Sequence, residues 1–260
     1  ARRRRMSQGS YVEADFQRDT TYLGDRITSD GSGEWPVEPG RYRLVVARAC
    51  PWANRAIIVR RLLGLEDVIS MGICGPTHDA DSWTFDLDPG GTDPVLGIPR
   101  IKDAYERRHP GYPRGITVPA VVDVPTGAVV TNDFPTITLD LTTQWRAHHR
   151  DGAPDLYPRQ HRTEIDEVNR RVYTEVNNGV YRCGFAGTQV AYDAAYARLF
   201  AAMDWLEGLG IAIADVHAHA GSMQSRFLEG LADLAVARLP IARLVPPAPA
   251  PRGNFLTFDV

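Results

Sequence analysis

One cysteine in this sequence has the surroundings of a reactive thiol. Cys50 follows the run 42–47, which has the composition of a buried strand, and precedes the run 52–63, whose apolar residues recur at helical spacing. Pro51 suits the first helical position, where the missing N–H costs nothing. A thiol at a helix start faces unpaired N–H groups and the positive end of the helix dipole. We therefore expect a lowered pKa at Cys50, with Arg48 adding to the favourable field.

The spacing of the cysteines limits the chemistry. A two-cysteine redox motif would place its second cysteine three residues after Cys50, but that position is Ala53. A mixed disulfide at Cys50 then has no resolving partner beside it and must be cleared by a thiol from outside. The sequence thus predicts a monothiol enzyme that uses a small soluble thiol. The alternative interpretation is that Cys50 is a small buried apolar residue.

The composition is that of an ordinary globular protein. Its 260 residues are 43% apolar with a formal net charge of −3, so we expect no nucleic-acid partner, and no apolar run is long enough to span a membrane. With no signal peptide and no disulfide framework, we expect a reducing, cytoplasmic setting for Cys50, Cys74 and Cys183. We predict no metal site, because no ligand spacing supports one at His148, His149 and His161.

An N-terminal extension precedes the first strand. Residues 1–40 combine a basic run ahead of Met6 with a polar, turn-rich stretch. We expect an extended arm that lies over the domain beginning near Arg41. After the helix, the run 68–73 predicts a second strand, parallel to the first because a helix joins the two.

A long stretch follows that second strand. Residues 75–114 are dense in proline, glycine and aspartate, and we expect an irregular loop of a length that is usually functional. Trp83 lies in this loop and is either a plug over the core or part of a ligand wall.

Pro119 marks the next element. It precedes an apolar run and removes a ladder donor, and beside a strand-end thiol we expect its peptide bond to be cis. A cis bond would expose the backbone of Val118 for antiparallel pairing with a peptide-like ligand. The turn 125–127 between two valine pairs predicts a hairpin, and Asp133 is the expected N-cap of a helix that ends near Trp145. A carboxylate there also suits a ligand ammonium group.

The order strand, helix, strand, loop, proline, strand, strand, helix is the thioredoxin-like arrangement. We expect helices over 161–180 and 188–209, with the first broken by the stretch 177–181 so that Tyr181 lies at a turn. The expected organisation is an extension at 1–40, a thioredoxin-like thiol-binding domain at 41–145, a linker at 146–157, a helical domain at 158–245 and a proline-rich tail at 246–260.

Five motifs carry a resemblance to a known family. They are Ala49-Cys50-Pro51-Trp52-Ala53, Trp83-Thr84-Phe85, Thr117-Val118-Pro119, Asn177-Asn178-Gly179-Val180-Tyr181 and Gly184-Phe185-Ala186. Over most of residues 20–207 the chain resembles the glutathionyl-hydroquinone reductases, also called Xi-class glutathione transferases, which are omega-like. The resemblance implies an α/β thioredoxin-like N-terminal domain and an all-α C-terminal domain.

The resemblance also implies a reaction and a site. Cys50 would attack a glutathionyl-hydroquinone, release the hydroquinone and become S-glutathionylated, and a second glutathione would regenerate the thiol. In the family pattern the glutathione pocket is lined at Trp83, Val118, Pro119 and Asp133, and Tyr181 faces the aromatic substrate. Gly115 replaces an arginine of that pattern, which leaves the neighbouring Arg114 as the candidate contact.

The resemblance fades after Glu207, so we expect a C-terminal part that is truncated or divergent. Helix faces around Val172 and Phe200 would then lack partners. The expected partners are glutathione and aromatic hydroquinone conjugates, with a homodimer as the candidate assembly. Two alternatives stay open: a general omega-like thiol transferase or dehydroascorbate reductase, and a non-catalytic remnant that binds the thiol but has a degraded C-terminal domain.

Overall fold

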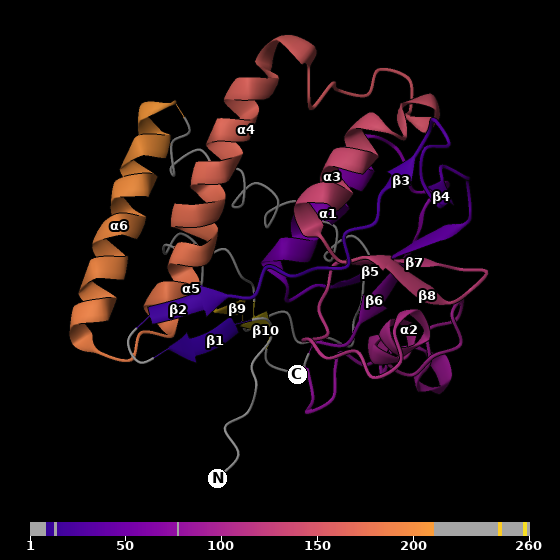
Figure 1. Ribbon diagram of the computed structural model, residues 1–260, viewed down its shortest axis with the longest axis horizontal. Helices are drawn as coiled ribbons and strands as arrows, with labels where there is room; N and C mark the ends of the chain where they lie inside the picture. Colours follow the sequence, from indigo (N-terminus) through magenta and orange to yellow (C-terminus); the bar gives the residue numbers. More distant parts are fainter. Residues whose placement is uncertain (1–8, 13–14, 77, 211–243, 246–256, 259–260) are drawn as a thin grey trace.

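The computed structural model describes residues 9–12, 15–76, 78–210, 244–245 and 257–258. A half built on a sheet and a half built of helices lie side by side (Figure 1). No helix in these described ranges is long and apolar enough to cross a membrane.

A four-stranded sheet forms the centre of the first half, in the order β6-β5-β7-β8. Its strands are β5 (Tyr42–Ala47), β6 (Ser70–Cys74), β7 (Ala120–Asp123) and β8 (Ala128–Thr131). β5 pairs parallel with β6 and antiparallel with β7, and β7 with β8 forms the predicted hairpin. The turn of that hairpin contains Gly127, whose φ of 66° suits glycine. The thioredoxin-like order predicted from the sequence is confirmed.

Helices cover both faces of this sheet. They are α1 (Pro51–Leu62) and α3 (Phe134–Thr143) on one face and α2 (Ile101–Arg108) on the other (Figure 1). Alternate residues of β5 point to opposite faces. Leu44 and Val46 belong to the apolar core that includes residues of α1 and α3, whereas Val45 and Ala47 belong to the core that includes residues of α2. This two-sided burial explains why apolar residues fill both faces of the strand, whose one charged residue, Arg43, is buried in an ion pair with Asp93.

The stretch after β6 is more ordered than the sequence suggests. The prediction of an irregular loop over 75–114 was wrong for residues 101–108, which form α2. Only a narrow side of α2 is apolar: Ile101, Ala104 and Tyr105 are buried in the core while the rest of the helix is mostly charged. A helix this short and this polar shows little hydrophobic periodicity in the sequence.

The described part of the N-terminal arm contains four short strands. They are β1 (Gly9–Val12), β2 (Asp15–Arg18), β3 (Ile27–Thr28) and β4 (Trp35–Pro36). The first pair of strands contacts the helical half, and the stretch that follows lies against the sheet domain. Between β2 and β3, the Leu23 N–H donates to the side-chain oxygen of Asn132 at 2.8 Å, and the Asn132 N–H donates to the Leu23 carbonyl at 3.1 Å. Arg26 forms an ion pair with buried Asp140. These contacts fix the arm along α3, from the pair of Leu23 and Asn132 at its start to Asp140 in its last turn.

The second half begins after two short 3₁₀ turns, η2 (Arg146–His148) and η3 (Arg159–His161). Its helical segments are α4 (Arg162–Arg171), η4 (Val172–Asn177), α5 (Asn178–Gly184) and α6 (Gln189–Gly208). The side chain of Thr188 caps α6 by accepting from the Ala191 N–H.

The expected break at 177–181 was wrong. The chain stays helical from α4 through the wider, π-helical η4 into α5, so Tyr181 lies on a helix and not at a turn. Gly179 serves packing here, since a Cβ at this position would lie 3.3 Å from Leu199 Cδ1 on α6. Asn178 is buried and donates to the Tyr173 carbonyl at 3.0 Å. A glycine and two asparagines therefore signalled close helix contact, not a turn.

An aromatic stack stays exposed on α6. Tyr192, Tyr196 and Phe200 are 40–48% exposed and stack one upon the next. The expected exposed face is confirmed at Phe200, whereas Val172 is half-buried.

Near the chain end, β9 (Leu244–Val245) pairs antiparallel with β10 (Thr257–Phe258), so the last two residues of the expected helical domain form a strand. The rest of 211–256 lies outside the described residues, and with it most of the expected proline-rich tail.

Candidate active site

Cys50 lies where the sequence places it, between β5 and the first residue of α1. It is the N-cap of that helix, with Pro51 at the first helical position. Its Sγ–H donates to the Val118 carbonyl across 3.4 Å. The Val118–Pro119 peptide bond is cis, which confirms that expectation. Strand end, helix start and proline loop thus meet at one thiol.

The pKa of Cys50 does not follow the prediction. Burial raises the pKa of this thiol, and the backbone N–H groups of Ala53 and Trp52 and the charge of Arg18 oppose that rise without cancelling it. The expected lowering was therefore wrong, because loss of water outweighs the helix start. Arg48, the cation expected to help, is exposed.

A cavity of about 200 Å³ opens beside the thiol. Thr117, Val118, Pro119, Asn132 and Trp83 form one part of its lining, and the Asn132 amide donates to the Thr117 hydroxyl at 2.9 Å. The other part is aromatic and cationic, and consists of Arg18, Tyr22, Trp52, Phe134 and Tyr181. A polar peptide-like group and a flat aromatic group therefore both find suitable surfaces within reach of the sulfur.

The aromatic part joins the two halves of the molecule. The Trp52 indole Nε1–H donates to the Tyr181 hydroxyl at 2.9 Å, which connects α1 to α5. Phe134 contacts Trp52 edge to face at 4.5 Å between ring centroids. Because the Tyr181 oxygen accepts from Trp52, its own hydrogen is available to an acceptor in the cavity.

The structure brings together most, but not all, of the predicted site residues. Cys50, Trp83, Val118, Pro119 and Tyr181 line the cavity.

Two predicted residues do not reach this lining. Arg114 pairs with Asp19 at 2.8 Å. Asp133 is the N-cap residue of α3, as predicted, but its carboxylate accepts from the Thr136 hydroxyl at 2.6 Å and makes no capping bond to the backbone.

Sequence reasoning missed several lining residues. Arg18 and Tyr22 come from the arm, which was expected only to cover the domain, and no spacing in the sequence connects them to Cys50. Trp52 was within reach of prediction, since it stands two residues after the thiol at the start of a helix. The described part of the chain holds no group of three or more His, Cys, Asp or Glu placed to bind an ion.

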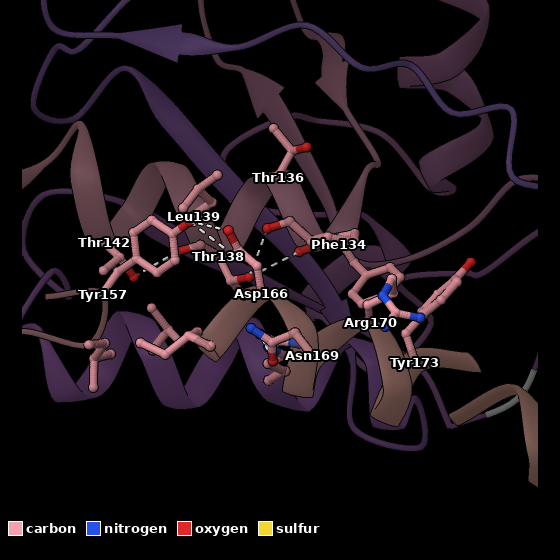
Figure 2. Close-up of a pocket in the computed structure, with 15 residues that line it drawn as sticks. Phe134, Thr136, Thr138, Leu139, Thr142, Tyr157, Asp166, Asn169, Arg170 and Tyr173 are labelled. Atoms are coloured by element: carbon pink, nitrogen blue, oxygen red, sulfur yellow. Dashed lines mark hydrogen bonds between the residues drawn. The ribbon is translucent and has the colours of Figure 1, made fainter. Parts of the chain in front are cut away.

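A second cavity, of about 380 Å³, lies between α1, α3 and α4 (Figure 2). Figure 2 shows Tyr157 directed at Asp166, to which its hydroxyl donates at 2.8 Å, with Asn169, Arg170 and Tyr173 along the same side. This cavity shares only Phe134 with the lining of the thiol cavity.

Comparison with known proteins agrees with this geometry. Residues 49–144 match the family model described as the glutathione S-transferase N-terminal domain. The chain is 38% identical over 200 residues to glutathionyl-hydroquinone reductase YqjG of Escherichia coli, a match covering 74% of this chain and 61% of that protein. It is 36% identical over 206 residues to glutathione S-transferase omega-like 2 of Schizosaccharomyces pombe, covering 78% of this chain and 66% of that protein.

Solved structures of glutathione transferases resemble this chain as well. A glutathione transferase from Gordonia bronchialis superposes with a TM-score of 0.71 at 72% identity, covering 72% of this chain and 58% of that one. The Xi glutathione transferase of Phanerochaete chrysosporium superposes with a TM-score of 0.70 at 39% identity, covering 75% and 64%.

Fold and comparisons together define a member of the glutathione transferases, with Cys50 at the start of α1. Within that class, the chain belongs to the Xi-class family, whose members include the glutathionyl-hydroquinone reductases. It spans between 54% and 66% of the length of the first three curated relatives it matches.

Proposed function

We propose that this protein reduces glutathionyl-hydroquinones to hydroquinones with glutathione, through a mixed disulfide at Cys50. One observation carries the proposal: a single cysteine at a helix start meets the Val118 carbonyl in a cavity whose other part is aromatic. Cys74 is 2% exposed, and neither it nor Cys183 lines that cavity, so a resolving thiol must come from a second glutathione.

Glutathione is proposed to bind along the polar part of the lining. The extended backbone at Val118 suits pairing with the peptide, and Trp83 covers it from the loop before α2. Asp133 stands at the start of α3, where its carboxylate suits the γ-glutamyl ammonium once the Thr136 contact opens. Arg114 would have to leave Asp19 to reach a ligand carboxylate.

The hydroquinone is proposed to lie on the aromatic part. Trp52 and Phe134 offer ring surfaces, and the free hydrogen of Tyr181 can be donated to a hydroxyl of the substrate. The Cys50 thiolate attacks the sulfur of the conjugate, an S–S bond forms, and the bond from sulfur to the ring breaks. A second glutathione thiolate then displaces Cys50, so that one hydroquinone and one glutathione disulfide form for each conjugate and glutathione consumed.

Steady-state turnover tests this assignment. Purified protein with a glutathionyl-hydroquinone and glutathione should release hydroquinone and glutathione disulfide in equal amounts. Cys50→Ser should lose turnover, whereas Cys183→Ser, outside the cavity lining, should keep it. Equal activity in the Cys50→Ser protein would refute the proposal.

A second candidate is a general thiol transferase or dehydroascorbate reductase, favoured by the omega-like name of a relative. Comparing kcat/KM for glutathionyl-hydroquinone, dehydroascorbate and a glutathione mixed disulfide separates the two. We also propose a reducing, cytoplasmic setting, which the three free cysteines support, and a homodimer as the assembly to test by light scattering.

A further inference from the structure

Arg18 carries the positive charge that lines the thiol cavity. It is the last residue of β2, and its guanidinium carbon lies 4.3 Å from the centroid of the Tyr181 ring and 4.7 Å from that of Trp52. Its Nε–H donates to the Asn178 side-chain oxygen at 2.5 Å. The arm thus places a cation in the aromatic part of the lining, on the rings proposed to receive the substrate.

Part of this guanidinium is left without a partner. Its Nη2 is buried, and among the residues that the structure describes it has no hydrogen-bond partner. Buried donors in native proteins are nearly always paired, so the unpaired Nη2 shows that the described residues do not satisfy all the donors of Arg18, a residue that lines the cavity. The described lining contains no aspartate or glutamate that would neutralise Arg18. An anionic oxygen is the natural complement of such a fork of N–H groups.

The proposed reaction generates such an oxygen. In the keto tautomer of the conjugate, a proton has moved from one hydroxyl to the ring carbon that bears sulfur. When the Cys50 thiolate takes the sulfur, the electron pair of the broken carbon–sulfur bond restores the aromatic ring and leaves the neighbouring oxygen as a phenolate. That phenolate then accepts the proton that the Cys50 thiol had lost, so atoms and electrons balance.

We propose that Arg18 is a catalytic residue that binds the oxygen of the departing hydroquinone and stabilises its negative charge during this step. The inference rests on the proposed function. Arginine stays protonated under these conditions, so Arg18 acts through charge and hydrogen bonds and not as an acid. Its charge also favours the Cys50 thiolate, against the effect of burial.

A structural role is the competing explanation. Arg18 would then only attach the arm to α5 through Asn178 and the rings, and its loss would slow every step alike. The two roles differ in one respect: only if Arg18 stabilises the charge does the rate lost on its removal increase with the basicity of the released phenolate.

The test compares Arg18→Met and Arg18→Lys with a matched control. Arg171→Met removes another arginine that lies on an aromatic ring, 4.0 Å from the centroid of Trp205, outside the thiol cavity. Hydroquinone release is measured in single turnovers with glutathionyl-hydroquinones bearing chloro, methyl or no further ring substituent, which order the phenolates by basicity.

Loss of one preorganised oxyanion donor typically slows a reaction on the order of 10²-fold. We expect a loss of this size for Arg18→Met with the most basic phenolate, a smaller loss with the chloro compound, and partial recovery in Arg18→Lys. The second step, in which glutathione acts on the preformed Cys50 mixed disulfide, releases no phenolate. It should therefore lose less than the first step in Arg18→Met, because only the effect of Arg18 on the departing Cys50 thiolate is lost. Equal losses for every substrate, or equal losses in both steps, would overturn the inference.

A binding measurement separates this inference from the proposed function. In a Cys50→Ser background, 4-nitrophenol is titrated with pH by absorbance, since its phenolate is coloured. We expect bound phenol to ionise at lower pH with Arg18 present than with methionine in its place, and the Arg171→Met protein to match the parent. If the wild type releases no hydroquinone but this shift is present, the reaction is misassigned while the phenolate site stands. If the shift is absent, Arg18 does not bind phenolates.

Discussion

The hydrogen bond from Trp52 to Tyr181 connects the thiol helix to the helical half, and its removal gives a measurable loss of stability. Trp52→Phe keeps a ring against Phe134 but removes the Nε1–H that donates at 2.9 Å. A hydrogen bond of this kind contributes about 0.5–1.5 kcal/mol net, and leaving its partner unpaired adds to the loss. The Tyr181 hydroxyl lines a cavity that admits water, so we place the coupling between the two side chains at about 1 kcal/mol.

A double-mutant cycle measures that coupling. The free energies of unfolding are compared for wild type, Trp52→Phe, Tyr181→Phe and the double variant, by denaturant titration followed by circular dichroism. Trp35→Phe is the matched control, because the Trp35 Nε1–H is buried with no partner in the described structure, and its loss costs no hydrogen bond. Additive losses in the cycle, with no coupling, would show that the two halves are not joined through this bond.

The remaining predictions concern the thiols, the helix contact and the C-terminal part. Cys50 should be alkylated faster than Cys74, because burial and the carboxylate of Asp93 raise the pKa of Cys74 to about 12. Burial raises the pKa of Cys50 as well, so the alkylation rate of Cys50 should still increase with pH above pH 8. Peptide mass mapping of iodoacetamide adducts measures both rates, and equal rates or a plateau below pH 8 would contradict the prediction. Gly179→Ala should destabilise the protein by about 1–3 kcal/mol, because the Cβ of the new alanine meets Leu199. Gly184→Ala should not destabilise it, because a Cβ at that position of the same helix meets open space. Equal melting temperatures for the two variants would refute the packing role of Gly179. When this protein is compared with a longer relative, its glutathione affinity, measured by calorimetry, should differ less than its hydroquinone turnover does. The reason is that the predicted thiol-binding residues all lie before position 134, whereas the chain spans only 61% of the E. coli reductase. Weak glutathione binding together with full turnover would contradict this prediction.

The sheet half was predictable because its signals are local. A mostly apolar run at 42–47, followed shortly by Cys50 and Pro51, encodes a buried strand and then a helix, and the turn at 125–127 encodes the hairpin. The helix α2 was missed because only a narrow side of it is apolar. The break expected at Gly179 was misplaced because the same residue type serves a turn or a close helix contact, and only the position of Leu199 decides between them.

The site was predictable where its residues are close in sequence to Cys50 or Pro119. The family resemblance singled out Trp83, Val118 and Tyr181, and the structure brings all three to the cavity lining. The positions of Arg18 and Tyr22 depend on the path of the arm. That path is fixed by long-range contacts, such as the one between Leu23 and Asn132, which cannot be predicted from the periodicity of the sequence. The direction of the Cys50 pKa also needed the structure, because burial is a property of the assembled fold.

A single-turnover experiment tests the central claim, the monothiol role of Cys50, most directly. Protein is mixed with one equivalent of a glutathionyl-hydroquinone in the absence of free glutathione, quenched in acid, and examined by chromatography and peptide mass spectrometry. We predict one hydroquinone released per protein and one glutathionyl group on the peptide that contains Cys50, with neither product in Cys50→Ser. Release of hydroquinone without a glutathionyl group on Cys50, or with the group on Cys183, would contradict the account.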